Sequence, residues 1–255
     1  MSAHLRAVIF DVDGTLVDSE RHGHRVAFNQ AFAAFDLPYT WDEDLYGDLL
    51  HVTGGQRRID TYLAGQGVPE AERAELAPAL HRRKTEILEA MVDEGAIEVR
   101  PGTARLLEEL AGAGVTLAVG TTGSRRWVEP LLRRTLPDVA WEVIVAGDDV
   151  TNRKPDPEVF TTAVDTLGLG PDDVVVVEDS GEGLEAARAA KLACVVVVNG
   201  YTAGHDLAGA DLVLDGFGAP GAPAQVVADP HGSGCDGILT AGVLRTVLQN
   251  RSAVG

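Results

Sequence analysis

Short, uninterrupted apolar runs recur along the chain. The first, Ala7–Phe10, is bounded by polar residues, a pattern that predicts a strand buried on both faces of a parallel sheet. Similar runs follow at 115–119, 142–146, 174–177, 194–198 and 212–214. Segments with helical apolar spacing separate them, one beginning at Pro101 and others at about 124–134, 157–167 and 183–190. This alternation predicts an α/β fold with a Rossmann-like parallel sheet and helices on both of its faces.

Residues 16–92 follow a different pattern. Their apolar positions have helical spacing over 19–36, 56–65 and 70–92, and strand signals are few. We therefore predict an all-helical domain at 16–92, inserted between the first two strands of a core domain made of residues 1–15 and 93–215. The remaining residues, 216–255, are rich in Gly and Pro. We expect them to form a tail that is loop or disordered over 216–235 and has a terminal helix near 238–249.

The composition of the chain narrows the class of protein. A hydrophobic content of 45% over 255 residues fits a soluble globular protein, and no apolar run approaches the roughly 20 residues that a membrane span requires. The first core strand begins at residue 7, which leaves no room for a signal peptide. Cys194 and Cys235 do not form a disulfide framework. We therefore predict a cytoplasmic protein, active as a monomer, with no membrane partner.

The balance of charge restricts the partners further. A formal net charge of −18 argues against nucleic-acid binding, which needs clustered Lys and Arg. A phosphorylated substrate would need local positive charge, supplied by a metal ion and a few basic side chains. Lysine is rare and occurs only at Lys84, Lys154 and Lys191, since Arg supplies most of the positive charge. A lysine kept against such a background can mark a site that needs a point charge on a flexible stem.

Two carboxylates stand at the end of the first predicted strand, in the segment Asp11-Val12-Asp13-Gly14-Thr15. Ligands of open α/β sheets bind at this edge. Two acids so close together repel one another unless a hard divalent cation such as Mg²⁺ lies between them. The competing interpretation is an ordinary Asp-Gly turn, and the segment alone favours neither.

Three more polar segments follow later strands. Thr121 and Thr122, within Gly120–Ser124, offer hydroxyl and backbone N–H groups for an oxyanion, or serve as an ordinary helix N-cap. Lys154 is flanked by rigid Pro residues in Lys154-Pro155-Asp156-Pro157, although it could also be a solvated surface lysine. Glu178-Asp179-Ser180 is either a second metal-binding edge or a helix cap. Four such segments at four strand ends of one sheet predict a single site.

The order of these four motifs resembles that of the haloacid dehalogenase superfamily hydrolases with a helical cap, over residues 5 to about 215. The resemblance implies that Asp11 is the nucleophile and that Asp13 is the general acid and base. It also implies that Thr121 and Lys154 hold the transferred phosphoryl group, with Thr122 beside them on the substrate. Asp179, supported by Glu178, would bind Mg²⁺ together with Asp11 and the backbone carbonyl of Asp13. A neighbouring acid such as Asp13 favours phosphate esters over haloacids, because dehalogenation needs no proton on the leaving group.

The helical segment resembles that of the CbbY-type sugar-phosphate phosphatases, which act on xylulose-1,5-bisphosphate. The residues that carry this likeness are His22–Asn29, Trp41, Leu45–Gly47 and Leu49–Ile59, although Gln56 and Arg57 replace the more usual Lys and Glu. The β-phosphoglucomutases share the same plan, and in them the arginine that corresponds to Arg58 binds a distal phosphate. The likeness also implies that Lys84, Gly55 and His24 contact substrate. The alternative is that Arg58, His24 and the run Arg82-Arg83-Lys84 are solvated helix residues.

These observations predict a Mg²⁺-dependent phosphatase of small phosphorylated sugars that works through an aspartyl-phosphate on Asp11. A pentulose bisphosphate such as xylulose-1,5-bisphosphate is the expected substrate. The alternatives are a sugar phosphomutase like β-phosphoglucomutase, a phosphoglycolate phosphatase, and a binding protein that keeps the fold without activity. The presence of Asp11, Asp13, Lys154 and Asp179 together disfavours the last of these.

Overall fold

The computed structural model describes residues 4–254 and divides the chain into two compact units. The core unit contains the chain up to Val17 and from Val99 onward, and the helical unit is Asp18–Glu98. The sequence pattern predicted the helical segment at 16–92, so both boundaries lie later in the structure. Val17 belongs to the core because it forms bridges with Asp13 and Val99. The tail is also part of the core unit, because its final helix packs on core strands.

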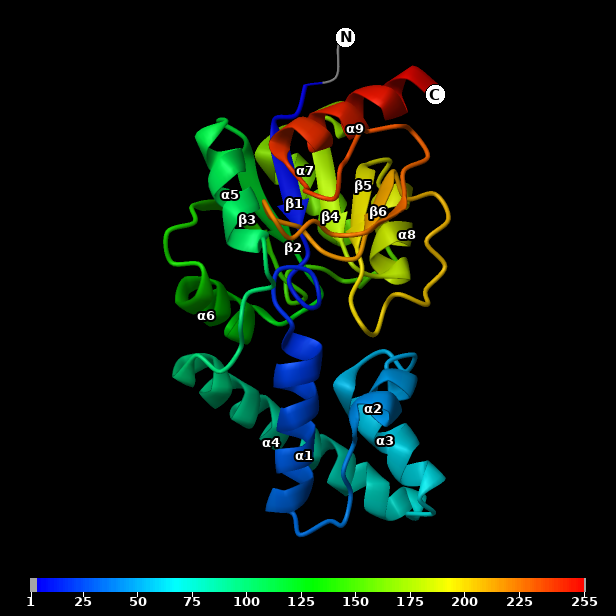
Figure 1. Cartoon of the computed structure of the whole chain (residues 1–255). Helices are drawn as coiled ribbons and strands as arrows, with labels where there is room; N and C mark the ends of the chain where they lie inside the picture. Colours follow the sequence, from blue (N-terminus) through cyan, green and yellow to red (C-terminus); the bar gives the residue numbers. More distant parts are fainter. Residues whose placement is uncertain (1–3, 255) are drawn as a thin grey trace. The chain divides into compact units, whose positions relative to one another are not determined.

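A seven-stranded sheet forms the centre of the core unit, in the order β3-β2-β1-β4-β5-β6-β7 (Figure 1). Every strand pair is parallel except β6 with β7, so the predicted Rossmann-like sheet is confirmed. The side chains of β1, β4 and β5 are fully buried, in keeping with their uninterrupted apolar sequences. The strands are β1 (Ala7–Phe10), β2 (Thr116–Gly120), β3 (Trp141–Val145), β4 (Val174–Glu178), β5 (Ala193–Val197), β6 (Leu212–Leu214) and β7 (Val226–Ala228).

Helices cover both faces of this sheet. Ala7 and Ile9 of β1 share one buried cluster with side chains of α7 (Glu158–Leu167) and α8 (Gly181–Ala189). The helices α5 (Thr103–Gly112) and α9 (Ala241–Val254) pack on the strands and on one another. The core unit also contains α6 (Arg125–Thr135) and the 3₁₀ turn η2 (Pro171–Asp173).

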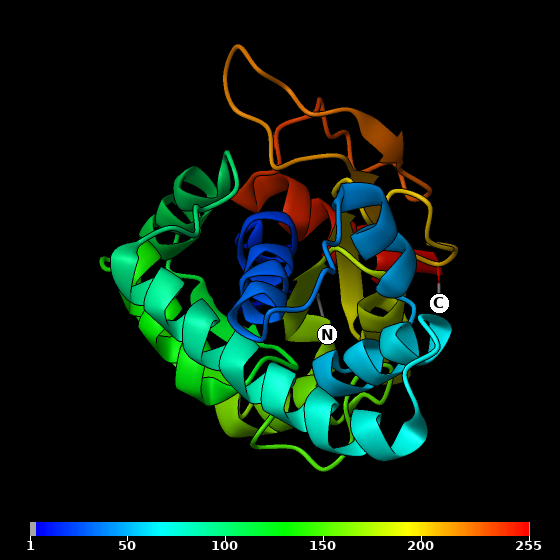
Figure 2. The ribbon, with the colours of Figure 1, turned by 90° about the horizontal axis from the view of Figure 1, so that it is seen from below.

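The helical unit is built around a cluster of aromatic rings. The Trp41 ring lies 4.8 Å from that of Phe28, 4.9 Å from that of Phe32 and 5.2 Å from that of Tyr62, measured between centroids. The side-chain amide of Asn29 holds the backbone of Trp41. It accepts a hydrogen bond from the Trp41 N–H and donates one to the Trp41 carbonyl, both at 2.8 Å. The long helix α4 packs against both α1 and α3 (Figure 2). The elements are the π-helical turn η1 (Glu20–His24), α1 (Arg25–Ala34), α2 (Glu43–Leu49), α3 (Gly55–Gly65) and α4 (Glu70–Glu94).

The strand order locates the site. The chain leaves β1 toward β2 and β3 on one side and then returns to β4 and β5 on the other, which creates a topological switch point beside β1. Phe10 is level with Val119 of β2 and with Val177 of β4. One edge of the sheet therefore contains the residue that comes next in each case: Asp11, Gly120 and Glu178. The predicted site residues of the core begin there.

Candidate active site

Lys154 joins three strand ends in the core unit. Its ammonium group donates to Asp11 Oδ1 at 2.7 Å, to Glu178 Oε1 at 2.6 Å and to the carbonyl of Gly120 at 2.9 Å. The side chain is buried, and its Nζ lies 4.7 Å from the centroid of the Phe160 ring. The interpretation of Lys154 as a solvated surface residue is therefore wrong. The register that brings Asp11, Gly120 and Glu178 to one level is what allows a single amine to reach all three.

The carboxylate partners of Lys154 keep its amine protonated. Burial alone would lower the pKa of Lys154, but the carboxylates of Asp11 and Glu178 raise the pKa above its ordinary value. The amine therefore stays protonated at neutral pH. A buried ammonium at this position is suited to holding the oxygens of a transferred phosphoryl group.

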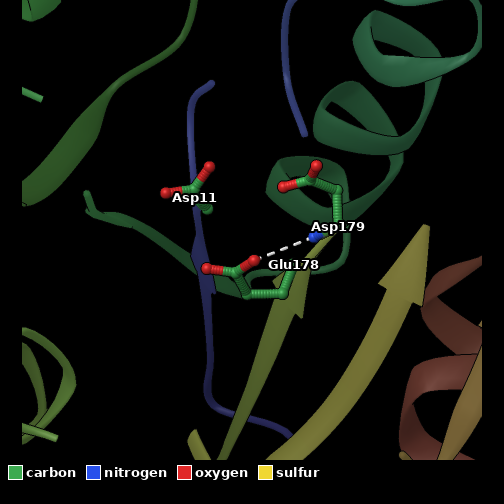
Figure 3. A group of neighbouring side chains, drawn as sticks. All are labelled: Asp11, Glu178 and Asp179. Carbon is green, nitrogen blue, oxygen red and sulfur yellow. Dashed lines mark hydrogen bonds between the residues drawn. The ribbon is translucent and has the colours of Figure 1, made fainter. Parts of the chain in front are cut away.

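Three acids form a cluster beyond the ends of β1 and β4 (Figure 3). Carboxylate oxygens of Asp11, Glu178 and Asp179 lie within 4.8 Å of one another, and all three residues are buried. Burial raises the pKa of Asp11 to about 7; the charge of Lys154 opposes this rise, and Glu178 and Asp13 add to it. Burial, Glu178 and Asp11 also raise the pKa of Asp179 well above its ordinary value. One ammonium group does not neutralise three buried carboxylates, so the cluster has more acidic groups than basic ones.

The donor atoms of this cluster fit a hard divalent cation, because they are carboxylate oxygens close together. The three acids differ in what else they bind. Glu178 Oε1 is bound to Lys154, while its Oε2 accepts from the backbone N–H groups of Asp179 and Ser180 and from the Ser180 hydroxyl, at 2.9–3.1 Å. Glu178 therefore has less capacity left for a metal than Asp11 or Asp179. This agrees with the supporting part that the resemblance implies for it.

Glycine is required where the next helix packs on Glu178. A Cβ atom added at Gly183 would lie 1.9 Å from Glu178 Cδ. Gly183 N–H also donates to the Ser180 hydroxyl, which caps α8. Ser180 thus caps a helix, while Glu178 and Asp179 contribute carboxylates to the cluster. That these carboxylates form a metal-binding edge stays a prediction.

Two residues that sequence reasoning missed hold Asp179. The Thr15 hydroxyl donates to Asp179 Oδ1 at 3.2 Å, and the Asn199 side-chain amide donates to Asp179 Oδ2 at 2.7 Å. Thr15 was visible within the first motif. Asn199 follows β5 by two residues, so a polar residue after a fifth strand end was the available signal.

The segment after β2 contributes two threonines. Thr121 is buried, and its Oγ1 accepts from the N–H of Gly123 at 3.1 Å, which leaves the hydroxyl proton able to donate to an oxyanion. Thr122 is half-buried, and its carbonyl lies so close to Gly147 that a Cβ there would be only 2.3 Å away. The N-cap position of α6 is occupied by Ser124. Neither threonine is therefore the cap residue that the alternative interpretation required.

Asp13 is half-buried and lies on the turn that follows β1. Its negative charge contributes to the raised pKa of Asp11. Among residues 4–254, its side chain is not part of the carboxylate cluster. The prediction that its backbone carbonyl, rather than its carboxylate, binds metal stays a prediction.

Within the helical unit, two predicted substrate contacts are buried cations. Arg58 is 9% exposed and Lys84 is 5% exposed, so the interpretation of either as a solvated helix residue is wrong. Arg58 donates to the Leu49 carbonyl at 3.1 Å and to the Tyr46 hydroxyl at 3.4 Å. The neighbouring Arg57 is exposed, which makes the burial of Arg58 specific to that position.

Lys84 and His24 form a pair. The Lys84 ammonium donates to His24 Nδ1 and lies 4.9 Å from the Phe28 ring centroid. Gly55 begins α3, and a Cβ there would lie 2.9 Å from the ring of His81. Arg82 and Arg83 are exposed, as the solvated-face interpretation expected for that run.

Comparisons with known proteins agree with these features. The sequence model of the haloacid dehalogenase-like hydrolases matches residues 5–191. A CBBY-like protein of Arabidopsis thaliana is 43% identical over 222 residues, which cover 84% of this chain and 70% of that protein. The protein CbbY of Cereibacter sphaeroides is 43% identical over 217 residues, covering 84% of this chain and 93% of its own.

Solved structures give the same result. A crystal structure of a mutant of CbbY from Rhodobacter sphaeroides in complex with xylulose-(1,5)bisphosphate is 42% identical and has a TM-score of 0.74, covering 84% of this chain and 95% of that one. A putative β-phosphoglucomutase from Thermotoga maritima is 29% identical, with a TM-score of 0.62 over 76% of this chain and 86% of its own. The family resemblance noted from the motifs is therefore confirmed.

Within the described part of the chain, no helix is long and apolar enough to span a membrane.

Proposed function

The chain belongs to the haloacid dehalogenase-like hydrolases, and from this membership we propose that it is a Mg²⁺-dependent phosphatase of small phosphorylated sugars. The favoured substrate is xylulose-1,5-bisphosphate or a close relative, because a 42% identical CbbY binds that compound in its crystal structure. The observation that carries the proposal is the position of Lys154 between Asp11 and Glu178, beside a buried cluster of acids.

Asp11 is the proposed nucleophile. Its carboxylate attacks phosphorus and forms an aspartyl-phosphate as the ester oxygen leaves, which divides hydrolysis into two easier steps. Asp11, Asp179 and the Asp13 carbonyl would hold Mg²⁺, which would supply positive charge to the phosphoryl oxygens and to the cluster. In its absence the pKa of Asp11 is about 7, so part of the nucleophile would be protonated at neutral pH.

Asp13 is the proposed general acid and base. It donates a proton to the leaving sugar oxygen and later removes one from the water that hydrolyses the aspartyl-phosphate. Lys154 and the hydroxyl of Thr121 donate hydrogen bonds to the phosphoryl oxygens, with Thr122 next to them. Phosphoryl transfer depends mainly on such positioning and neutralisation of charge.

The second phosphate of a bisphosphate needs another cation, since Lys154 already has two carboxylate partners. We assign this function to Arg58, whose planar guanidinium group suits two phosphate oxygens. Lys84 supplies further positive charge. His24 contacts a sugar or phosphate oxygen, and Gly55 allows the close approach of α3 backbone to substrate.

Three related activities are distinguishable. A phosphomutase would return the phosphoryl group to the sugar, and a phosphoglycolate phosphatase would have no second phosphate for Arg58. A binding protein without activity would have no need for Asp11, Asp13, Lys154 and Asp179 together.

A substrate panel tests the proposal. Phosphate release would be measured from xylulose-1,5-bisphosphate, 2-phosphoglycolate and p-nitrophenyl phosphate, with Mg²⁺ or with EDTA. We expect the highest kcat/KM for the bisphosphate, loss of activity with EDTA and recovery with added Mg²⁺. Conversion of β-glucose 1-phosphate to glucose 6-phosphate would instead indicate a mutase, and no turnover of any of these compounds would contradict an enzyme of this class.

We further propose that the protein acts as a monomer in the cytoplasm. Cys194 and Cys235 are both free thiols, as is usual for proteins of reducing compartments. Light scattering on the purified protein tests the monomer, and a dimer mass at micromolar concentration would contradict it.

A further inference from the structure

Arg100 makes a set of contacts that the proposed chemistry has not used. It belongs to the core unit and is half-buried, immediately after the helical unit ends. Its Nη1 donates to the carbonyls of Gly14 at 2.5 Å and Val197 at 2.9 Å, and its Nη2 donates to the carbonyl of Val198 at 2.7 Å. Its backbone N–H donates to the Leu16 carbonyl at 2.9 Å. One guanidinium group thus ties the turn after β1 to the end of β5.

The carbonyl of Gly14 is the point where this network meets the acidic cluster. Asn199 donates to the same carbonyl at 3.2 Å while it donates to Asp179 Oδ2 at 2.7 Å. Gly14 has a φ of +80°, and a Cβ on it would lie 2.5 Å from Asp179 Oδ2. The backbone of Gly14 therefore packs directly on the Asp179 carboxylate. A shift of this turn would displace Asp179 and also Thr15, which donates to its other oxygen.

We propose that Arg100 is a positioning residue that fixes the turn 11–15 and the Asp179 carboxylate relative to one another, and so sets the affinity of the site for its divalent cation. This inference rests on the proposed metal-dependent phosphatase function. Arg100 acts on the cluster through Gly14 and Asn199, and its positive charge also opposes the rise in the pKa of Asp179; it is given no contact with substrate. Lysine cannot replace it fully, because a single ammonium group lacks the planar fork that reaches three carbonyls from two segments.

The chain offers a matched control in Arg105. It also donates to two backbone carbonyls, those of Leu239 at 2.6 Å and Phe217 at 3.4 Å, and it pairs with Glu109 at 3.1 Å. These partners join α5 to the C-terminal region and include none of the residues of the acidic cluster. Loss of Arg105 should therefore reduce stability in a similar way without changing the site.

The test compares wild type, Arg100→Ala, Arg100→Lys and Arg105→Ala. Isothermal titration calorimetry would measure Mg²⁺ binding to each purified protein, and thermal unfolding without metal would report stability. We expect Arg100→Ala to weaken Mg²⁺ binding by about 10- to 100-fold, as is typical when a residue that orients a metal ligand is lost. Arg100→Lys should be intermediate, and Arg105→Ala should match the wild-type affinity within about twofold although its Tm falls. Excess Mg²⁺ should restore part of kcat for p-nitrophenyl phosphate in Arg100→Ala.

The outcomes separate this inference from the function on which it rests. If wild type binds Mg²⁺ and releases phosphate but both Arg100 variants bind Mg²⁺ within twofold of wild type, Arg100 is only structural. Equal loss of Mg²⁺ affinity in Arg105→Ala would lead to the same conclusion. If Arg100→Ala does not fold, weakened Mg²⁺ binding by a folded Arg100→Lys with the Tm of wild type supports the assignment. A wild-type protein that binds no Mg²⁺ would overturn the proposed function, and this inference with it.

Discussion

The strand ends of the core unit and the helices of the helical unit both contain buried charge, but they hold it in different ways. In the core, Lys154 forms ion pairs with two of the three clustered acids, Asp11 and Glu178, at the ends of β1 and β4. In the helical unit, Arg58 donates to a backbone carbonyl and a phenol, and Lys84 donates to the ring of His24. Lys154 therefore has direct carboxylate partners, whereas Arg58 donates to a backbone carbonyl and a phenol.

This difference indicates how the two units divide the work. A lysine already paired with two carboxylates is held in place whether or not substrate is bound. The Tyr46 phenol that accepts from Arg58 itself donates to Glu20, so this carboxylate reaches Arg58 through a neutral group, and an anionic ligand can bind the guanidinium group more directly. We therefore expect loss of the core groups to affect every substrate, and loss of Arg58 to affect substrates with a second anion.

The largest expected effect belongs to Asp11→Asn. The amide is nearly the same size but cannot form an acyl phosphate, so kcat should fall by at least about 10⁴-fold on all substrates. Stability should not decrease, because the change removes one of three crowded buried carboxylates. Steady-state kinetics and thermal unfolding would measure the two effects. Residual activity of even a few per cent would mean that another group is the nucleophile.

Lys154→Met should have the next largest effect. We expect kcat/KM to fall by about 10²- to 10³-fold, equally for bisphosphates and for p-nitrophenyl phosphate, because the phosphoryl group loses a donor. The metal-free protein should also lose about 3–5 kcal/mol of unfolding free energy, since Asp11 and Glu178 lose their buried partner.

The exposed lysine of the chain supplies the control for this change. Lys191→Met should leave both kinetics and stability near the wild-type values, because Lys191 is at the surface. A loss confined to bisphosphate substrates in Lys154→Met would contradict the division between the units.

Arg58→Ala tests the helical unit instead of the core unit. For a bisphosphate we expect kcat/KM to fall about 30- to 900-fold. This equals a loss of about 2–4 kcal/mol of transition-state stabilisation, the range for truncating one partner of a desolvated charge pair. For p-nitrophenyl phosphate, which has no second anion, the same change should have almost no effect. The neighbouring exposed residue is the matched control, and Arg57→Ala should change neither substrate by more than about threefold. Equal losses on both substrates for Arg58→Ala would show that Arg58 serves the fold.

The smallest effect is expected from Asn29→Ala, which removes both hydrogen bonds to the Trp41 backbone. Loss of this half-buried amide should cost about 1–3 kcal/mol of unfolding free energy. Hydrolysis of p-nitrophenyl phosphate should stay near wild type, since the chemistry lies in the core unit. Thermal unfolding and kinetics at a temperature well below Tm would measure both. A large loss of kcat on this small substrate would show that the helical unit takes part in the chemical step.

The core could be predicted well from the sequence because its functional residues follow buried strands. The apolar runs before Asp11, Thr121 and Glu178 identify three of these strands, and parallel pairing then brings their ends to one edge. The strand β7 was missed, since three residues in a Gly-rich and Pro-rich segment with Val227 exposed do not form a buried apolar run. The helix α2 was missed because it is only seven residues long and only Tyr46 of it is buried.

Other residues could not be predicted because their partners are distant in the sequence. Arg100 contacts residues 86 and 98 positions away, and Asn199 contacts one that is 185 positions away. These contacts are to backbone carbonyls, which every residue type provides, so no spacing of residue types reveals them. The burial of Arg58 beside an exposed Arg57 likewise depends on how α3 packs, and both arginines look alike in the sequence.

The central claim is that chemistry occurs on Asp11 at the strand ends of the core unit. It is tested most directly by quenching the enzyme in acid during turnover of p-nitrophenyl phosphate and locating the phosphoryl group by peptide mass spectrometry. We expect an acyl phosphate on the peptide that contains Asp11, formed only with Mg²⁺ and absent in Asp11→Asn. A phosphoryl group on any other residue, or full turnover by Asp11→Asn, would contradict it.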